Sequence, residues 1–376
     1  MSTTPSGGTG ARRVDIDWLR IIVVLSMVPF HVALVFTNRG FMFVKSGLHS
    51  PLLWAFVGFI YSWAMPLLFF VSGVGAWFSL KRRSAARFLW ERTVRLAPPS
   101  LVGLLVLVPL CAYLTHRQTV ASPLGLGAYL ARHFANPQVR DVYWGHVWFL
   151  VALLVLAFVL LPALVVLRLD ILERLRDRFS AALRVPGALL LAAVPIAAVA
   201  PLPSASGLPT FGWGMIAPQG VAYLIGFLLA SHDRLREAID RSLVPALVVG
   251  AALGLLTIWV PIYARRDVLP HVVFYLGRWA WVLAAVGLAQ RFLHRDCRAR
   301  RYVTDAGLAL YLLHVPVASL VAYGVIQTGW PIACQFLVIT AATYLGTIAA
   351  YEVLVRRWNP MRRLFGLRPR NPRLRS

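Results

Sequence analysis

Acidic residues are scarce in this chain of 376 residues, where 14 Asp and Glu stand against 38 Lys and Arg and the formal net charge is +24. Charged residues of both signs make up only 14% of the chain, whereas apolar residues make up 59%, above the roughly 45–50% that is usual in soluble domains. So few polar groups cannot solvate a globule, which excludes a soluble enzyme, a disordered chain and a coiled coil. The basic residues lie between apolar runs and not together on a water-soluble fold, so we expect no nucleic-acid partner.

Cysteine is scarce as well, since Cys111, Cys297 and Cys334 are far apart and form no C-x-x-C pair. This spacing indicates no disulfide framework, and we expect no metal ion and no bound cofactor. A signal-peptide cleavage site is also missing. Basic residues precede the first apolar stretch, but that stretch runs to His31 and beyond without an A-x-A sequence, so we expect the first helix to be retained.

Long apolar segments occupy most of the chain. A helix that spans the hydrocarbon core of a bilayer needs about 20 mostly apolar residues. We therefore expect an all-α polytopic membrane protein with about ten transmembrane helices, over residues 18–37, 52–80, 97–114, 146–167, 186–201, 215–231, 243–263, 270–290, 307–326 and 332–354. Pro66 in the second segment predicts a kink, because proline removes a backbone donor.

The basic residues predict how these helices are oriented. Of the 38, 29 fall on one side of the membrane, 7 fall on the other side, and Arg20 and Arg278 lie in spans. Lys and Arg are enriched in cytoplasmic loops, so we expect both termini in the cytoplasm and the protein in the inner or plasma membrane of the cell. We expect one transmembrane domain, 14–355, between a loose tail, 1–13, and a basic tail, 356–376, that lies on anionic lipid.

Ionisable residues inside the expected spans are the first candidates for function, because such groups are costly in a bilayer. They are Arg20, His31, His146, Arg278, His314 and Glu352. In the first helix, His31 follows Arg20 by three turns, which is about 16 Å, so both lie on one face with the histidine in the outer half of the bilayer. A lone histidine is more often a packing residue, but an arginine and a histidine on one stripe favour function.

Other polar residues have simpler explanations beside the functional one. Arg92 and Arg95 are three residues apart and therefore neighbours on one helix face, at the cytoplasmic end of the third span. Paired guanidinium groups suit phosphate oxygens, although membrane topology alone also explains them. Ser72 and Gly73 form a small pair that favours close helix packing.

Two more histidines lie near the ends of expected spans. His146, followed by Trp148, begins the fourth span at the outer surface, where an interfacial role is the simpler interpretation. His314 precedes Pro316 and lies one or two turns inside the cytoplasmic end of the ninth span. Packing and function both stay open for these two histidines.

Taken in order, these segments resemble the acyltransferase 3 family of integral membrane acyltransferases over about residues 14–355. The matching segments are Asp17-Trp18-Leu19-Arg20…His31, Met65-Pro66…Phe69-Phe70…Ser72-Gly73, Arg92-x-x-Arg95-Leu96…Pro98, His146-x-Trp148-Phe149-Leu150 and Tyr311-Leu312-Leu313-His314-x-Pro316. The first helix is most similar to the branch of the glucan-succinylating OpgC-type proteins.

The resemblance implies an O-acyltransferase that moves a small acyl group, acetyl or succinyl, from cytoplasmic acyl-CoA to a hydroxyl of an envelope glycan, a glycolipid or a glycosylated product. It implies that His31 is catalytic, as a general base or through a transient acyl-imidazole, and that Arg20, Arg92 and Arg95 bind acyl-CoA. The implied partners are acyl-CoA as co-substrate, a carbohydrate or glycolipid acceptor, and the lipid bilayer.

One part of such a site is missing near His31. No acidic residue lies between His31 and Glu91, so no carboxylate close in sequence can orient the imidazole. Asp141, on the outer loop before His146, is the better of two outer candidates. The residues that we carry as supporting candidates are Ser72, Asp141, His146 and His314.

Three other functions stay open from the sequence. The first is a secondary transporter or flippase that uses ionisable residues of the spans as a proton or anion path, although we detect none of the repeated halves common in transporters. The second is another family of membrane O-acyltransferases with His314 as its lone catalytic histidine. The third is a structural or sensor protein.

Overall fold

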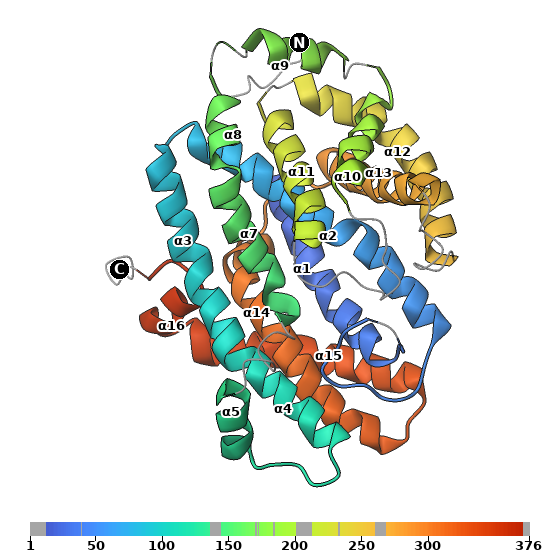
Figure 1. The fold of residues 1–376 in the computed structure, drawn as a ribbon, viewed down its shortest axis with the longest axis vertical. Helices are drawn as coiled ribbons and strands as arrows, with labels where there is room; N and C mark the ends of the chain where they lie inside the picture. Colours follow the sequence, from blue (N-terminus) through green and yellow to red (C-terminus); the bar gives the residue numbers. More distant parts are fainter. Residues whose placement is uncertain are drawn as a thin grey trace.

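The structure is a computed structural model that describes residues 13–38, 40–135, 144–169, 171, 173–182, 185–200, 213–231, 234–259 and 268–370. This part of the chain is helical and contains no strand, as expected of an all-α protein (Figure 1). Residues 1–12, Asp141 and the last six residues lie outside the described part.

The helices fall into long spans and short connecting turns. They are α1 (Val14–Val35), α2 (Pro51–Leu80), α3 (Ala85–Val102), η1 (Gly103–Leu107), α4 (Val108–Thr119), α5 (Leu126–Ala135), η2 (Gly145–Val147), α7 (Trp148–Val159), α8 (Leu161–Val166), α9 (Glu173–Ala182), η4 (Ala188–Ala192), α10 (Ala193–Val199), α11 (Trp213–Leu229), α12 (Arg234–Trp259), α13 (Val268–Phe292), α14 (Arg298–Val325), η6 (Ile326–Thr328), α15 (Ile332–Ala350), η7 (Tyr351–Val355) and α16 (Asn359–Leu364). Helix α1 contacts α2, α13, α14 and α15 and so lies inside the bundle (Figure 1).

Six helices in the described part are long and apolar enough to cross a membrane. They are Val14–Val35, Pro51–Leu80, Ala85–Thr119, His271–Phe292, Arg298–Thr328 and Ile332–Val355. Three shorter apolar helices, Gly145–Val159, Ala188–Val199 and Gly214–Leu229, and the 26-residue α12 lie where the other four spans were expected. The chain is therefore a multi-pass helical membrane protein, and the count of ten spans and the orientation stay predictions.

The helices of the third, seventh and ninth expected spans begin well before the residue that hydropathy predicts. The third was expected from residue 97, but α3 begins at Ala85, where the side chain of Ser84 accepts a hydrogen bond from Arg87 N and caps the helix. The ninth was expected from residue 307, but α14 begins at Arg298. In both α3 and α14 the first turns are basic. Hydropathy does not count these turns, so it places the start of the span at the later apolar run.

Charged residues join the first turns of α1 and α14. The carboxylate of Asp17 accepts from Arg300 Nη1 at 2.5 Å, and Arg300 also donates to Asp296 at 2.8 Å. Trp18 Nε1 donates to the Arg295 carbonyl at 2.9 Å. Arg300 and Asp17 are 2% and 6% exposed, so this is a buried pair with its hydrogen bonds satisfied. It places the starts of the two helices side by side at one end of the bundle.

The other end of α1 is closed by Lys45. Its ammonium group donates to the carbonyls of Leu34, Thr37 and Gly40 at 2.7, 3.1 and 3.0 Å. The last carbonyls of a helix have no partner within the helix, so this lysine holds the turn that follows His31. Burial lowers the pKa of Lys45 to about 8.

Glycines bring α2 and α11 into backbone contact. A Cβ added at Gly73 would lie 1.9 Å from the Tyr223 carbonyl oxygen, and one added at Gly226 would lie 2.1 Å from the Phe70 carbonyl oxygen. The two positions thus interlock reciprocally, and neither admits a larger residue. Gly73 serves the close packing expected of a small residue in a membrane helix.

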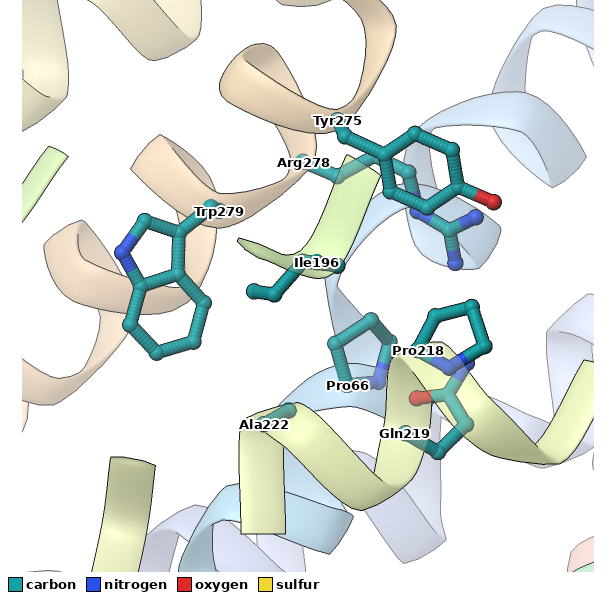
Figure 2. Close-up of a pocket in the computed structure, with 8 residues that line it drawn as sticks. All are labelled: Pro66, Ile196, Pro218, Gln219, Ala222, Tyr275, Arg278 and Trp279. Atoms are coloured by element: carbon teal, nitrogen blue, oxygen red, sulfur yellow. The ribbon is translucent and has the colours of Figure 1, made fainter. Parts of the chain in front are cut away.

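Pro66 lies within α2, which continues through it as a helix. The proline cannot donate to the Ser62 carbonyl, and Arg278 Nε donates to that carbonyl instead at 3.1 Å, while Nη2 reaches the Tyr61 carbonyl at 3.2 Å. Its guanidinium also lies over three aromatic rings, with Tyr61 nearest at 4.8 Å. Arg278 therefore stabilises the turn that Pro66 leaves open, beside a small pocket that it lines together with Gln219 and Trp279 (Figure 2).

Candidate functional site

Three histidines from distant parts of the chain lie together inside the bundle. His31 comes from α1, His146 from η2 and His314 from α14. His314 Nε2 is 3.1 Å from His31 Nδ1, although the two residues are 283 positions apart. The ring centroids of His146 and His314 are 5.6 Å apart. His31 is half-buried, and the other two are buried.

The neighbours of these rings assign the protons on their nitrogens. His314 Nδ1 is 2.5 Å from the Tyr311 carbonyl and must donate to it, which leaves Nε2 as an acceptor in the neutral ring. His31 Nδ1 then carries the ring proton and shares it, as a bifurcated donor, between the Met27 carbonyl at 2.9 Å and His314 Nε2 at 3.1 Å. With its proton on Nδ1, His31 carries the free lone pair on Nε2, which is the nitrogen that can take up a proton.

His146 links η2 to α14 through hydrogen bonds. Its Nε2 donates to the Leu312 carbonyl at 2.9 Å, and the Tyr311 hydroxyl donates to the His146 carbonyl. These two bonds join η2 to the turn of α14 that carries His314. Nδ1 of His146 is buried and has no hydrogen-bond partner among the described residues.

A glycine lets α3 and its continuation approach this cluster. Gly103 begins η1, one π-helical turn within a continuous helix. A Cβ at Gly103 would lie 2.6 Å from Val147 Cγ2 and 3.1 Å from Leu312 Cδ1. Val147 follows His146 in the chain, and the Leu312 carbonyl accepts a hydrogen bond from His146. A larger residue at position 103 would therefore displace the segments that hold the histidines.

A basic cluster lies at the other end of α1. Arg20 pairs with Asp17 at 3.5 Å, and the Nη2 atoms of Arg20 and Arg92 point to the same place above α2. A Cβ at Gly75 would be 3.2 Å from the first and 3.9 Å from the second. The missing side chain of Gly75 therefore leaves room for two guanidinium groups to converge. Arg95 is exposed on the same helix as Arg92, which repels it electrostatically.

The Asp17–Arg300–Asp296 contacts support this basic end. Hydrogen bonds from Arg300 and Arg301 hold the pKa of Asp296 below its usual value. Asp17, which is buried, contacts both Arg300 and Arg20 and so orients the arginine of α1. Its spacing of three residues from Arg20 could have been read from the sequence, whereas its partner on α14 could not.

The structure sorts the expected site residues into two groups. His31, His146 and His314 come together at one level of the bundle. Arg20 converges with Arg92 of α3 about three turns away along α1, and Arg95 follows Arg92 by one turn of α3. Ser72 joins neither group directly, because its hydroxyl donates to the Leu68 carbonyl of its own helix at 2.7 Å. Asp141 lies outside the described residues. Among those described, no carboxylate hydrogen-bonds to the three histidines, and no three or more His, Cys, Asp or Glu side chains are arranged to hold a metal ion.

The depth expected for His314 was wrong. A span beginning at residue 307 places His314 one or two turns from the cytoplasmic end. Because α14 begins at Arg298, His314 is 16 residues into the helix, about 24 Å along it. It therefore lies at the level of His31, in agreement with the 3.1 Å between the two rings' nitrogens.

Comparison with known proteins supplies the family. The model of the acyltransferase 3 family, described as an acyltransferase domain, matches residues 13–352. No curated protein and no solved structure matches the chain. The match covers both clusters and nearly all of the chain, and it agrees with the resemblance carried by the sequence motifs. The chain belongs to the acyltransferase 3 family of membrane acyltransferases.

Proposed function

We propose that this acyltransferase moves a small acyl group, acetyl or succinyl, from cytoplasmic acyl-CoA to a hydroxyl group of an envelope glycan, a glycolipid or a glycosylated product. In this proposal the protein lies in the inner or plasma membrane with both termini in the cytoplasm. Acyl-CoA binds from the cytoplasmic side, and the acceptor is a carbohydrate or glycolipid that approaches from the outer side.

The observation that carries the proposal is the separation of two unlike clusters along one helix. Arg20 and Arg92 converge over Gly75 at one end of α1, and His31 meets His314 about 16 Å further along. Acyl-CoA has its groups in a matching order: its phosphates lie at one end and its thioester at the other, with the slim pantetheine arm between them. Arginines suit phosphate oxygens, and an imidazole exchanges protons near neutral pH.

The chemistry follows from the assigned protons. His31 Nε2 takes the proton of the acceptor hydroxyl as the oxygen attacks the thioester carbonyl carbon. The carbon–sulfur bond then breaks, the acyl group stays on the acceptor oxygen, and the proton on His31 passes to the sulfur, which leaves as the free thiol. No oxidant, metal ion or further group is needed for this balance.

In this mechanism His314 takes the place of the carboxylate that orients many catalytic histidines. Its Nε2 lone pair holds the proton of His31 on Nδ1, so that Nε2 faces the acceptor with its lone pair. When His31 becomes an imidazolium, the same hydrogen bond becomes charge-assisted and stronger. His314 is thus a positioning residue, and His31 is the catalytic residue.

The test is direct acyl transfer by purified protein in nanodiscs. Radiolabelled acetyl-CoA and succinyl-CoA are supplied together with an envelope glycan fraction, and mass spectrometry locates any new ester. We expect label on the glycan with wild-type protein and a loss of about 10²–10⁴ with His31→Gln. If the same protein in sealed proteoliposomes moves label across the membrane and forms no ester, the protein is a transporter or flippase instead.

The same assay separates the two roles of His31. If His31 is a general base, the quenched protein carries no label. If it forms an acyl-imidazole intermediate, the protein carries label when the acceptor is omitted and the reaction is quenched. Label on the wild-type protein and none on His31→Gln would show that His31 acts through a covalent intermediate and not as a general base.

A further inference from the structure

Residues 359–370 form a closed turn, here called the C-terminal hook. Asn359 Oδ1 accepts from Arg370 N at 2.8 Å, and Asn359 Nδ2 donates back to the Arg370 carbonyl at 3.3 Å. Across the same turn, Arg362 Nε donates to the Arg368 carbonyl at 2.8 Å. These side-chain-to-backbone bonds give the segment one defined shape.

The hook is seated on α3 at Arg95. Phe365 is 4% exposed and anchors it. Gly366 has a φ of +69°, and a Cβ there would lie 2.3 Å from the Arg95 carbonyl oxygen and 2.6 Å from Leu308 Cδ2. Both the backbone conformation and the close approach require glycine at this position. The chain therefore brings the hook into direct contact with the helix that carries the two site arginines.

This contact places like charges side by side. Arg95 and Arg368 are both exposed, and Arg368 and Arg92 each repel Arg95 electrostatically, against one attracting carboxylate at Asp305. Among the described residues, Arg92, Arg95 and Arg368 form no ion pair with a carboxylate. Repulsion of this kind is relieved when a multivalent anion binds between the guanidinium groups.

CoA carries phosphate in two places, and the arginines fall into two groups. Its diphosphate is in line with the pantetheine arm, and its 3′-phosphate branches from the ribose. Following α1 from His31, the first arginine is Arg20, which shares the space above Gly75 with Arg92. Arg95 follows Arg92 by one turn of α3, at the place where Gly366 of the hook approaches the Arg95 carbonyl.

We propose that the C-terminal hook completes the nucleotide end of the acyl-CoA site, with Arg368 and Arg95 binding the 3′-phosphate while Arg20 and Arg92 bind the diphosphate. This inference rests on the proposed function, because it takes acyl-CoA as the donor. It gives the 3′-phosphate a recognition element that lies outside the matched family segment, which ends at residue 352.

The experiment compares acetyl-CoA with 3′-dephospho-acetyl-CoA as donors for full-length protein in nanodiscs of neutral phosphatidylcholine. Arg368→Gln should raise the KM for acetyl-CoA by about 5- to 10-fold, the range of one exposed charge-assisted contact, and should leave the KM for the dephospho donor unchanged. Arg363→Gln is the matched control, because Arg363 is an exposed arginine of the same hook, and it should behave as wild type with both donors. Gly366→Ala keeps every charge but unseats the hook, so it should reproduce the selective loss.

Each outcome decides the inference. Equal effects of Arg368→Gln and Arg363→Gln, or equal effects on the two donors, overturn it while leaving the acyltransferase proposal intact. A variant whose activity depends on added anionic lipid, with no change of KM in neutral nanodiscs, shows that Arg368 binds a lipid phosphate and also overturns it. If wild-type protein neither binds nor uses acyl-CoA, the proposed function itself fails.

Discussion

Replacing His314 with phenylalanine keeps an aromatic ring in place but removes the nitrogen that lies 3.1 Å from His31 Nδ1. In the resting protein this nitrogen accepts an ordinary hydrogen bond. When His31 takes up the proton of the acceptor hydroxyl, the bond becomes charge-assisted, and such bonds contribute about 1.5–3 kcal/mol where an ordinary one contributes about 0.5–1.5 kcal/mol. Only the difference, about 1–1.5 kcal/mol, belongs to the transition state, so we expect His314→Phe to lower kcat by about 5- to 12-fold and to leave the KM for acyl-CoA nearly unchanged.

His314→Gln is the matched variant, because the side-chain oxygen of glutamine can still accept a hydrogen bond from His31 Nδ1. It should recover most of the kcat that the phenylalanine variant loses. In the double variant with His31→Gln, the His314 substitution should cause little further loss, since a residue that acts through His31 has no effect once the base is gone.

The assay is steady-state transfer of labelled acyl groups, with acyl-CoA binding and the melting temperature as controls for folding. Wild-type kcat in His314→Phe would refute the role of His314. So would a loss that adds in full to that of His31→Gln, because the two side chains would then act independently.

Three further predictions concern the basic end, the topology and the packing. Arg95→Ala, and to a smaller extent Arg92→Ala, should raise the KM for acyl-CoA more than it lowers kcat, since phosphate binding is shared by ground and transition states; abolished turnover at unchanged KM would contradict this. Reporters fused after residue 376 and within 121–140 should report opposite sides of the membrane, and the same side for both would contradict the orientation. Gly226→Val should reduce folded protein, measured by size-exclusion chromatography, because its side chain would overlap the Phe70 carbonyl, whereas Gly324→Ala, with open space around it, should not.

The axis of the candidate site could be predicted from the first helix alone. Eleven residues separate Arg20 from His31, and helical geometry places both on one face three turns apart. The close packing at Gly73 could be predicted in kind, since small residues favour helix contact. Its partner Gly226 could not, because nothing in the local pattern of either helix says which two helices cross.

The position of His314 could not be predicted, and the reason is physical. Hydropathy locates the apolar part of a helix, but α14 begins with a charged segment that includes Arg300 and Asp305. Arg300 is buried there because Asp17, 283 residues away, neutralises it. A rule that starts the span at the first apolar run therefore shortens the helix and moves the histidine toward the wrong end.

The missing carboxylate near His31 follows from the same setting. A carboxylate taken out of water costs several kcal/mol unless it is paired and hydrogen-bonded, and Asp17 meets that condition at the basic end through Arg300. Around His31 the described contacts are the Met27 carbonyl, the ring of His314 and the ring of Phe30, which hold the imidazole without adding a charge. These neutral groups stabilise an imidazolium less strongly than a carboxylate would. A carboxylate, however, would need a buried cation to balance its charge in the resting protein. In the described part of the chain, the buried charges of Asp17 and Arg300 thus lie at the basic end of α1, and neutral groups surround His31. Under the proposed function, these are the end that binds phosphate and the place where the proton moves.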